Sequence, residues 1–431
     1  MAVSSPEHRR RLEALDEAAL KDRQLARLND LISAILPSNQ FYADKFAGLE
    51  FPLTSWERFY ELPFTSKDEM LASAGTHARP ANLSWPIEQY VYFHRTSGTR
   101  GRPLAVYDTA EDWRWWIESW QFVLDAAEIE SDDRAMLAFS FGPFIGFWSA
   151  HAALIERGTL AIPGGGMSSL ARLNLIEQTS ATTLLCTPTY ALHLAETAAE
   201  HKIDLASLGV RKMIVAGEAG GSIVSTRQRI ESAWQAQVVD HAGASEVGPW
   251  GYADAERVGL HVLQSEFIPE FFSVETGDRA RPGELAHLVI TALGRRGMPA
   301  IRYRTGDLVR PTWPEGRENR FVLLRGGVLG RADDMMVIRG VNLFPSSVEQ
   351  ILRSFPEVVE YRLTARRKGA MDEVEIEVED RLRDSQRIAN ELQLRLGLRI
   401  AVRQAPMMSL PRYEGKGRRF VDERDGVSGN A

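Results

Sequence analysis

The stretch TTLLCTPTYALHLAETAAEHKIDLASLGVRKMIVAGE, residues 182–218, carries the pattern that decides the fold. It opens with an apolar, strand-like run, continues into a helix-like segment that begins at Pro188, and ends in a second strand-like run. The same alternation extends outward to MLAFSF (136–141) and TLAIP (159–163) on one side and to QVVDHAG (237–243) on the other. Strands that alternate with helices predict βαβ units and a mostly parallel, buried sheet.

The two flanks of this region have a different texture. Residues 8–35 carry leucines near helical spacing, which predicts an amphipathic helix that ends before Pro37. From about residue 260 onward, short strand-like runs separated by Gly and Pro predict an antiparallel or barrel-like subdomain. A glycine-rich junction at 325–334 precedes the helix and strand patterns of a small α+β region. We therefore expect an α/β fold with a large domain at 1–329, which includes the β-rich subdomain, and a small α+β domain at 330–431.

Composition and charge exclude several classes of protein. The 431 residues include 51 Lys and Arg and 58 Asp and Glu, so the net charge of −7 gives no reason to expect nucleic acid as a partner. The single cysteine, Cys186, cannot form an internal disulfide or a multi-cysteine metal cluster. The longest apolar stretch, residues 139–153, is too short and too interrupted to cross a membrane, and the N-terminus lacks an apolar signal core. A cytoplasmic protein without a membrane partner is expected.

Ligands of parallel sheets bind at the carboxyl ends of the strands, which directs attention to the turns at 216–221 and 242–248. The segment DHAGASEVG (240–248) offers Glu246, a carboxylate suited to a hard cation such as Mg²⁺. An ordinary helix N-cap is the alternative for this segment, and Ser245 fits that role equally well.

Three further segments carry chemistry. RTSGTRGRPLAVYDT (95–109) is dense in Ser, Thr and Gly, whose N–H and hydroxyl donors suit phosphate oxygens, and Arg100 or Arg102 can add charge. It lacks the Walker A pattern, and an ordinary turn is the alternative. In IRYRTGDLVR (301–310), Asp307 follows a glycine turn and can accept two hydrogen bonds from a ribose diol, unless it is a solvated turn residue. In PRYEGKGRR (411–419), Lys416 lies between two glycines and can reach an anion, unless the segment is a plain basic tail.

Taken together, these segments resemble the adenylate-forming superfamily of acyl- and aryl-CoA ligases, and most closely its phenylacetate–CoA ligase-like branch. TSGTRGRP (96–103) is similar to the family's phosphate loop, HAGASE (241–246) to its adenine and magnesium motif, and YRTGDL (303–308) to its ribose motif. GRADDMMVIRGVNLFPSSVEQIL (330–352) resembles the interdomain hinge and the first helix of the small domain, and PRYEGKGRR resembles the catalytic-lysine motif. The opening FYADKF…LPFTSKDEM also matches the branch, and the resemblance covers residues 20–421.

The resemblance implies two half-reactions. A carboxylate attacks the α-phosphate of ATP, which gives an acyl-adenylate and pyrophosphate, and a thiol, usually that of coenzyme A, then displaces AMP. The first step brings two anions together, so it needs positive charge and positioned donors more than a protein nucleophile. The expected cofactors are ATP, Mg²⁺ and coenzyme A, and the expected substrate is an aryl or arylacetic acid. Transfer to a carrier-protein thiol, an amine or a hydroxyl stays open, as do a non-catalytic nucleotide-binding homologue and a homodimer.

The motif matches assign roles residue by residue. Glu246 binds Mg²⁺, Lys416 contacts the α-phosphate and the attacking carboxylate, Asp307 accepts the ribose hydroxyls, and Asp333 is the hinge of the small lid domain. ATP binding is assigned to Thr96, Ser97, Gly98, Thr99, Gly101, Arg102, Gly217, Glu218, Ala242, Gly243, Ser245, Asp307 and Arg331. The acid pocket is assigned to Phe141, Phe144, Trp148, Ala216 and Gly243, where an aromatic lining suits an aryl acid and ordinary core packing is the alternative.

Three features depart from the family pattern or need separate explanation. Arg102 stands where the family often has Lys, and a guanidinium fork is not equivalent to a point charge. Ala242 replaces the usual aromatic residue of the adenine motif, and the neighbouring His241 is expected to point to the other face of its strand. The dense tryptophans at 113–120 share a helical face, which favours core packing. With Cys186 alone, the chain cannot form the cysteine-based zinc site of some relatives.

Overall fold

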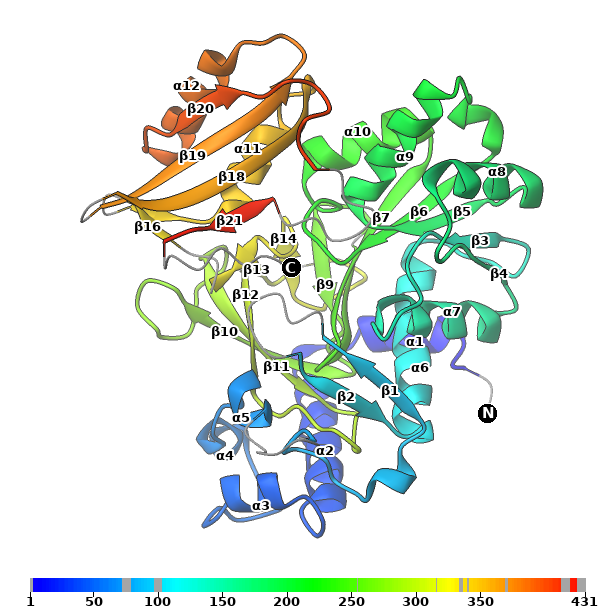
Figure 1. Ribbon diagram of the computed structural model, residues 1–431. Coiled ribbons are helices and arrows are strands. Elements are labelled where there is room, and N and C mark those ends of the chain that lie inside the picture. Colours follow the sequence, from blue (N-terminus) through cyan, green and yellow to red (C-terminus); the bar gives the residue numbers. More distant parts are fainter. Residues whose placement is uncertain are drawn as a thin grey trace.

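The computed structural model describes residues 3–71, 79–96, 103–253, 255–314, 316–332, 336–338, 341–368, 371–411 and 419–424. The chain forms a large α/β body and a smaller C-terminal unit, coloured orange to red in Figure 1, which lies beside helix α10 (Val224–Trp234). The predicted fold class is confirmed. No helix in the described part of the chain is both long enough and apolar enough to cross a membrane.

The large sheet has nine strands in the order β13-β14-β9-β8-β7-β6-β5-β3-β4. Its parallel half is built from the predicted βαβ strands β3 (Arg134–Leu137), β4 (Leu160–Pro163), β5 (Thr183–Cys186), β6 (Lys212–Ala216) and β7 (Gln237–Ala244). All four residues of β5 are buried, as expected for a strand covered on both faces. Antiparallel strands complete the sheet: β8 (Gly248–Ala253), β9 (Gly259–Val262), β13 (Pro311–Thr312) and β14 (Leu323–Arg325).

Helices connect the parallel strands. They are α7 (Gly146–Arg157), α8 (Ser169–Thr179), α9 (Pro188–Glu200) and α10. The predicted start of α9 at Pro188 is confirmed, and the side chain of Thr187 caps it by accepting the N–H of Tyr190. The helix α6 (Ala110–Ala126) packs across β8, and its tryptophans Trp113, Trp116 and Trp120 are buried in the main core, as predicted.

The predicted β-rich subdomain is a four-stranded antiparallel sheet in the order β10-β11-β12-β15. Its strands are β10 (Phe267–Ser273), β11 (Ala286–Ala292), β12 (Tyr303–Val309) and β15 (Gly330–Arg331). The strand-like run that begins at 261 was expected here, but it belongs to β9 and extends the nine-stranded sheet instead. The reason is its pairing with β8 on one side and β14 on the other, which local sequence does not encode.

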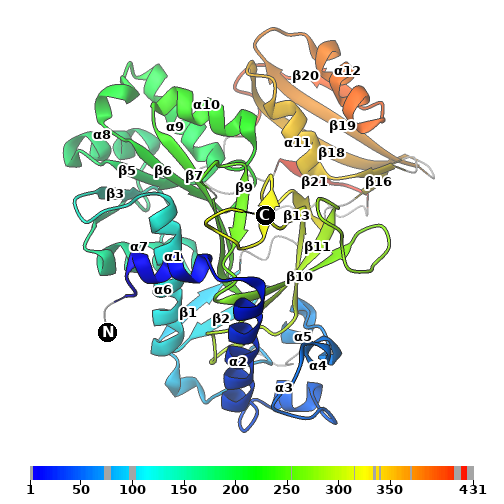
Figure 2. The same cartoon turned by 180° about the vertical axis from the view of Figure 1, so that it is seen from behind.

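The N-terminal region forms five helices: α1 (Pro6–Glu13), α2 (Glu17–Ile35), α3 (Gln40–Lys45), α4 (Trp56–Glu61) and α5 (Lys67–Leu71). The single helix predicted for residues 8–35 is wrong, because the chain breaks at 14–16 and the side chain of Asp16 caps α2 by accepting the N–H of Ala19. Figure 2 shows α1 beside α6, with α2 on the near side of the molecule, in front of the strands.

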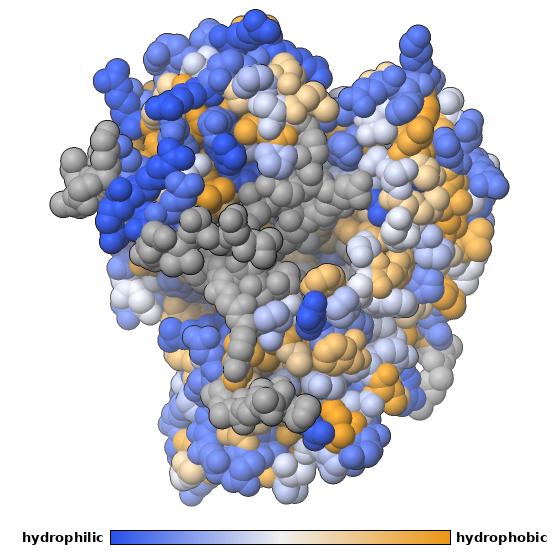
Figure 3. All heavy atoms as spheres, viewed as in Figure 1, coloured by the Kyte–Doolittle hydropathy of each residue, from blue (hydrophilic) through white to orange (hydrophobic). Residues whose placement is uncertain are grey.

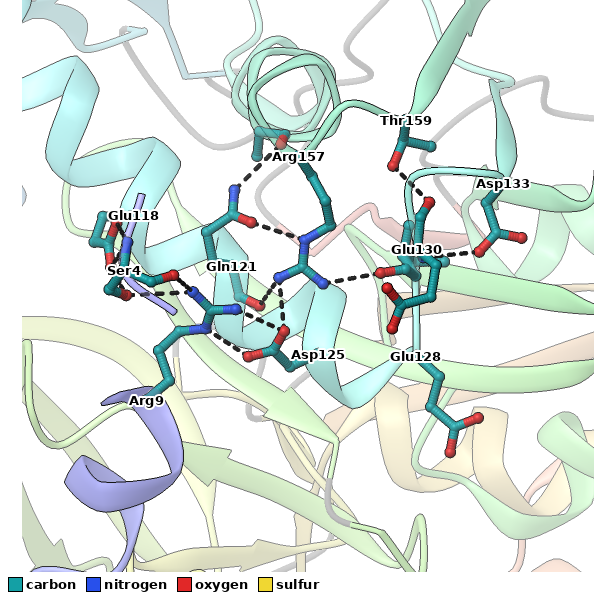
Figure 4. A network of polar contacts seen from close by, with 12 residues as sticks. Ser4, Arg9, Glu118, Gln121, Asp125, Glu128, Glu130, Asp133, Arg157 and Thr159 are labelled. Carbon is teal, nitrogen blue, oxygen red and sulfur yellow. Dashed lines mark hydrogen bonds and ion pairs between the residues drawn. The ribbon is translucent and has the colours of Figure 1, made fainter. Parts of the chain in front are cut away.

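Buried ion pairs hold α1 against the body, as Figure 4 shows. The guanidinium of Arg9, only 2% exposed, donates from Nη2 to Oδ1 of Asp125 at 2.8 Å, and Arg157 of α7 donates to the same oxygen at 2.6 Å. Arg157 also donates from Nε to the side chain of Gln121 at 2.9 Å. Three helices far apart in the sequence are therefore joined through one carboxylate.

The C-terminal unit has its own hydrophobic core, formed by residues between 336 and 420. Its elements are β16 (Met336–Ile338), β17 (Val341–Leu343), α11 (Pro345–Arg353), β18 (Val358–Lys368), β19 (Met371–Asp380), α12 (Ser385–Leu396), β20 (Ala401–Gln404) and β21 (Phe420–Asp422). The predicted small α+β domain is thus present as an α+β fold. The exact domain boundary between residues 329 and 330 stays a prediction.

Candidate active site

The turn after β6 contains the first predicted nucleotide-binding residues. Gly217 has a φ of +91°, a left-handed conformation that favours glycine, and it redirects the chain over the sheet edge. The carboxylate of Glu218 accepts the backbone N–H of Thr189 at 2.8 Å and its hydroxyl, both at the first turn of α9. Burial raises the pKa of Glu218. Its carboxylate therefore stabilises a helix N-terminus, and its predicted adenine contact stays a prediction.

The turn between β7 and β8 presents Glu246. The residue is largely buried, and its Oε1 lies 3.6 Å from Nζ of Lys67. Gly243 needs to be small here, because a Cβ at this position would lie 3.1 Å from the carbonyl oxygen of Gly248. Ala242 is half-buried against the main core, and Ser245 immediately precedes the carboxylate.

A two-stranded hairpin, β1 (Tyr92–Arg95) and β2 (Ala105–Asp108), carries the predicted phosphate loop. Thr96 exchanges hydrogen bonds with Leu104 across the mouth of this loop: its N–H donates to the carbonyl, and its Oγ1 accepts the N–H, both at 3.0 Å. Ser97, Gly98, Thr99, Gly101 and Arg102, together with Asp333 and Lys416, lie outside the described residues.

Lys67 is a site residue that the sequence analysis missed. Its Nζ donates to Oγ1 of Thr96 at 3.2 Å while pairing with Glu246, so one cation bridges the phosphate hairpin and the predicted magnesium ligand. The segment before Lys67 is attached to β12, since the N–H of Thr65 donates to the carbonyl of Arg302 and the N–H of Arg304 to the carbonyl of Thr65, both at 2.9 Å. The stretch LPFTSKDEM matched the family branch, but that match gave Lys67 no role.

Asp307 and Arg331 lie opposite each other on β12 and β15. Nη1 of Arg331 donates to Oδ1 of Asp307 at 3.1 Å, and the N–H of Asp307 donates to the hydroxyl of Thr305 at 3.0 Å. The glycine turn predicted before Asp307 is wrong, because Gly306 lies within β12, where its φ of +78° accompanies a shift in the register of the β11–β12 pairing. The two predicted ribose-binding residues are therefore neighbours, and their roles remain predictions.

A second buried carboxylate lies beneath the turn after β6. Asp240, in β7, accepts the hydroxyl of Ser222 at 2.5 Å, and burial raises the pKa of Asp240 to about 6. A Cβ on Gly221 would lie 2.5 Å from this carboxyl group, so only glycine fits there. The next residue, His241, points to the opposite face, as expected: its Nδ1 is 2.7 Å from the carbonyl oxygen of Gly251, and burial lowers the pKa of His241 to about 4.

The predicted acid-pocket residues follow β3 and abut the phosphate hairpin. The N–H of Arg95 donates to the carbonyl of Pro143 at 2.6 Å, which joins the two segments directly. The rings of Phe141 and Trp148 meet edge to face at 4.9 Å. Phe144 and Trp148 are 43% and 39% exposed, so the described residues do not enclose them. In Figure 3, hydrophobic residues also cover the neighbouring β1–β2 hairpin. Ala216, at the end of β6, is buried.

Several charged residues line a pocket between the large body and the C-terminal unit. This pocket is lined by Thr189, Leu192, His193 and Glu196 of α9, Arg229 of α10, and Arg353, Val359, Glu360 and Arg419 of the C-terminal unit. Within the C-terminal unit, Arg419 pairs with Glu360 through two contacts of 2.6 and 2.9 Å. Thr189, whose N–H donates to Glu218, lines this pocket, so the two units meet beside the predicted adenine turn.

Comparison with known proteins identifies the family. The AMP-binding enzyme family matches residues 45–265, about half of the chain, and the AMP-binding enzyme C-terminal domain matches residues 340–424. The phenylacetate-coenzyme A ligase of Escherichia coli is 30% identical over 79% of this chain and 80% of its own, and that of Thermus thermophilus is 29% identical over 96% and 98%. The chain belongs to the AMP-binding enzyme family. It is an adenylate-forming CoA ligase, which uses ATP and coenzyme A, so the predicted resemblance is confirmed.

A solved structure adds information about the arrangement of the two units. The 2-hydroxyisobutyryl-CoA ligase, 26% identical, has a TM-score of 0.90 in its postadenylation state, over 98% of this chain and 94% of its own. The same relative in its thioesterification state, with coenzyme A, gives a TM-score of only 0.73 over the same shares. The C-terminal unit is therefore placed here much as in the postadenylation state of that relative.

Proposed function

We propose that this enzyme activates an aryl or arylacetic acid with ATP, releases pyrophosphate, and transfers the acyl group to coenzyme A with release of AMP. The observation that carries the proposal is the convergence of Lys67, Thr96 and Glu246 at one end of the sheet, next to the aromatic segment around Phe141. The names of the phenylacetate-coenzyme A ligases, which align with up to 96% of this chain, support an aromatic acid.

The groups at this point suit the first half-reaction. The ammonium of Lys67 and the donors of the phosphate loop lower the repulsion between a triphosphate and an incoming carboxylate. Lys67 contacts Thr96 at 3.2 Å, so it lies where the phosphate loop starts. The carbonyl of Pro143 holds the aromatic segment on the same hairpin, which supports placing the acid beside the α-phosphate.

The donor set at Glu246 fits a magnesium ion shared with the substrate. The described residues contain no group of three or more His, Cys, Asp or Glu side chains that could hold a metal by themselves. Mg²⁺ commonly takes one or two carboxylates, several waters and substrate phosphates, and Glu246 beside the hydroxyl of Thr96 meets that pattern. When bound, Mg²⁺ would neutralise charge on the phosphates.

The remaining nucleotide contacts follow from the motif matches. Asp307 would accept the ribose hydroxyls with Arg331 beside it, and the backbone around Gly217 and Ala242 would line the adenine. Lys416 would reach the α-phosphate from the small domain at 330–431, which would rotate about Asp333 between the two half-reactions. The fit to the postadenylation state of the 2-hydroxyisobutyryl-CoA ligase supports such a two-state lid.

The test is pyrophosphate release from MgATP over a panel of aryl and arylacetic acids, each with and without coenzyme A, with 2-hydroxyisobutyrate as the aliphatic comparison. An aromatic acid that gives multiple turnovers and an acyl-CoA only with coenzyme A would support the full proposal. Preference for 2-hydroxyisobutyrate would overturn the aromatic assignment. Release that ignores coenzyme A would indicate another acceptor, such as a carrier protein. Lys416→Ala and Glu246→Gln should each abolish adenylate formation while leaving the fold intact.

A further inference from the structure

The loop between β11 and β12 contains the sequence GRRG at 294–297, and its first arginine contacts both the turn of Glu246 and the end of the β1–β2 hairpin that is remote from the phosphate loop. Nε of Arg295 donates to Oδ1 of Asp108 at 2.8 Å, and its Nη1 donates to the backbone carbonyl of Ser245 at 2.8 Å. Asp108 ends β2 of the phosphate hairpin, whereas Ser245 directly precedes Glu246. One guanidinium group therefore ties the phosphate hairpin to the turn that carries the predicted magnesium ligand.

This ion pair lies in the interior of the protein. The side chains of Arg295 and Asp108 are both 0% exposed, and Asp108 also accepts the indole N–H of Trp116 at 3.2 Å. The guanidinium lies 5.7 Å from the centre of the Trp116 ring. Breaking a buried pair strands an uncompensated charge, whereas replacing both partners by apolar groups is often tolerated. The burial of this pair is therefore weak evidence for a purely stabilising role. Because Arg295 contacts both Asp108 and the carbonyl of Ser245, a role in positioning these two segments is the better explanation.

The backbone of the GRRG loop is itself fixed. The carboxylate of Asp112 accepts the N–H of Arg296 at 2.7 Å and that of Gly297 at 3.2 Å. A Cβ on Gly294 would lie 2.1 Å from the Trp115 ring, and one on Gly297 would lie 2.4 Å from Asp112. Both glycines of the loop are closely packed and its N–H groups are bound by Asp112, so Arg295 projects from a well-packed support.

We propose that Arg295 is a positioning residue for the ATP site. By holding the Ser245 carbonyl and Asp108 on one planar fork, it sets the direction of Glu246 relative to the phosphate donors around Thr96. A preformed site presents the carboxylate of Glu246 and the hydroxyl of Thr96 to MgATP in a fixed arrangement, which lowers the reorganisation needed on binding. The proposal rests on the proposed magnesium role of Glu246, and it gives Arg295 no contact with the substrate.

The experiment measures equilibrium binding of ATP with Mg²⁺ and with EDTA, so it needs no knowledge of the acid. Wild type should bind MgATP more tightly than metal-free ATP. Arg295→Met should lose about tenfold or more in MgATP affinity but much less in metal-free affinity, because the Glu246 turn is no longer held. Arg295→Lys keeps the charge without the fork, so it should recover only part of the preference. Arg296→Met is the matched control: its side chain is 38% exposed, and the variant should behave as wild type.

The possible outcomes distinguish a failure of the positioning role of Arg295 from a failure of the proposed magnesium role of Glu246. A folded Arg295→Met protein in which both affinities fall by the same factor, or do not change, would overturn the positioning role and leave only a structural one. If Arg295→Met does not fold, the Lys variant decides by the same comparison of the two affinities. A wild-type protein without any preference for MgATP, matched by Glu246→Gln, would instead show that the magnesium assignment itself is wrong.

Discussion

Replacing Asp307 with Asn tests the proposed ribose site, because it removes one charge while keeping the shape of the side chain. In the absence of ligand, the substitution weakens the ion pair with Arg331 at 3.1 Å, in which the Arg331 side chain is 45% exposed. Exposed ion pairs contribute about 0.2–1 kcal/mol, so the stability of the protein should change by less than about 1 kcal/mol.

The loss in ATP binding should be larger than the loss in stability. A hydrogen bond to a charged group contributes about 1.5–3 kcal/mol against about 1 kcal/mol for a neutral one, so two ribose hydroxyls should lose about 2 kcal/mol together. That corresponds to a dissociation constant for MgATP about 30-fold higher.

The assay compares MgATP with its 2′-deoxy analogue by equilibrium titration. Wild type should bind the deoxy analogue more weakly, and Asp307→Asn should discriminate less between the two ligands, because the lost hydroxyl no longer meets a charged acceptor. Asp278→Asn, an exposed turn aspartate between β10 and β11, is the matched control and should bind as wild type does. An Asp307→Asn protein with unchanged affinity, or with the full wild-type discrimination, would refute the ribose assignment.

Three further changes give distinct outcomes. Lys67→Met should weaken MgATP binding about tenfold, since a cation beside the phosphate hairpin is lost. Lys67→Arg should restore part of this affinity. The same MgATP affinity in wild type and Lys67→Met, measured by equilibrium titration, would contradict this role. Gly165→Val should raise the KM for the acid but not for ATP in initial-rate kinetics, because a Cβ there would lie 2.9 Å from the Phe141 ring; unchanged KM values would exclude Phe141 from the acid pocket. Burial raises the pKa of Asp240 to about 6, so the stability this group contributes at low pH is lost as the pH rises from about 4 to about 6. In wild type, the free energy of unfolding should therefore fall by about 3 kcal/mol over this pH range, whereas Asp240→Asn should not show this fall. Denaturant midpoints of the two proteins, measured across this pH range, should differ by an amount that changes with pH. A difference that stays the same at every pH would refute the prediction.

Local pattern was enough for the parallel half of the large sheet. Runs such as TTLLC are apolar throughout because both faces of β5 are covered, and a following Pro at the first helical position marks α9. The break between α1 and α2 could also have been predicted, because Asp16 followed by a helix-like run is an N-cap signal. The continuous leucine periodicity instead led to the prediction of one long helix. These features depend on neighbours within a few residues.

The unpredicted parts of the site depend on contacts between distant segments. Lys67 meets Glu246, and Arg295 meets Asp108 across 187 positions, without a spacing that would mark either pair beforehand. Both cations sit in stretches that also suit ordinary surface turns. Hydrogen bonds of neighbouring residues position these two cations. The backbone of Thr65 pairs with β12 beside Lys67, and the carboxylate of Asp112 accepts an N–H of the GRRG loop beside Arg295. The motif matches predicted a ribose role for Asp307 and Arg331, and the fold shows that the two residues are neighbours.

The charged contact between the two units bears on how the lid would move. An apolar interface would resist separation in proportion to its buried area, whereas charged groups recover hydration when the units part. Arg419 keeps its partner Glu360 within the C-terminal unit, so this pair survives a rotation intact. Glu349 and Glu218 are like charges across the contact, which opposes tight closure once both are ionised. If the C-terminal unit moves as a lid, we expect the nucleotide and coenzyme A, rather than the interface, to select between the postadenylation and thioesterification states in which its relative is known.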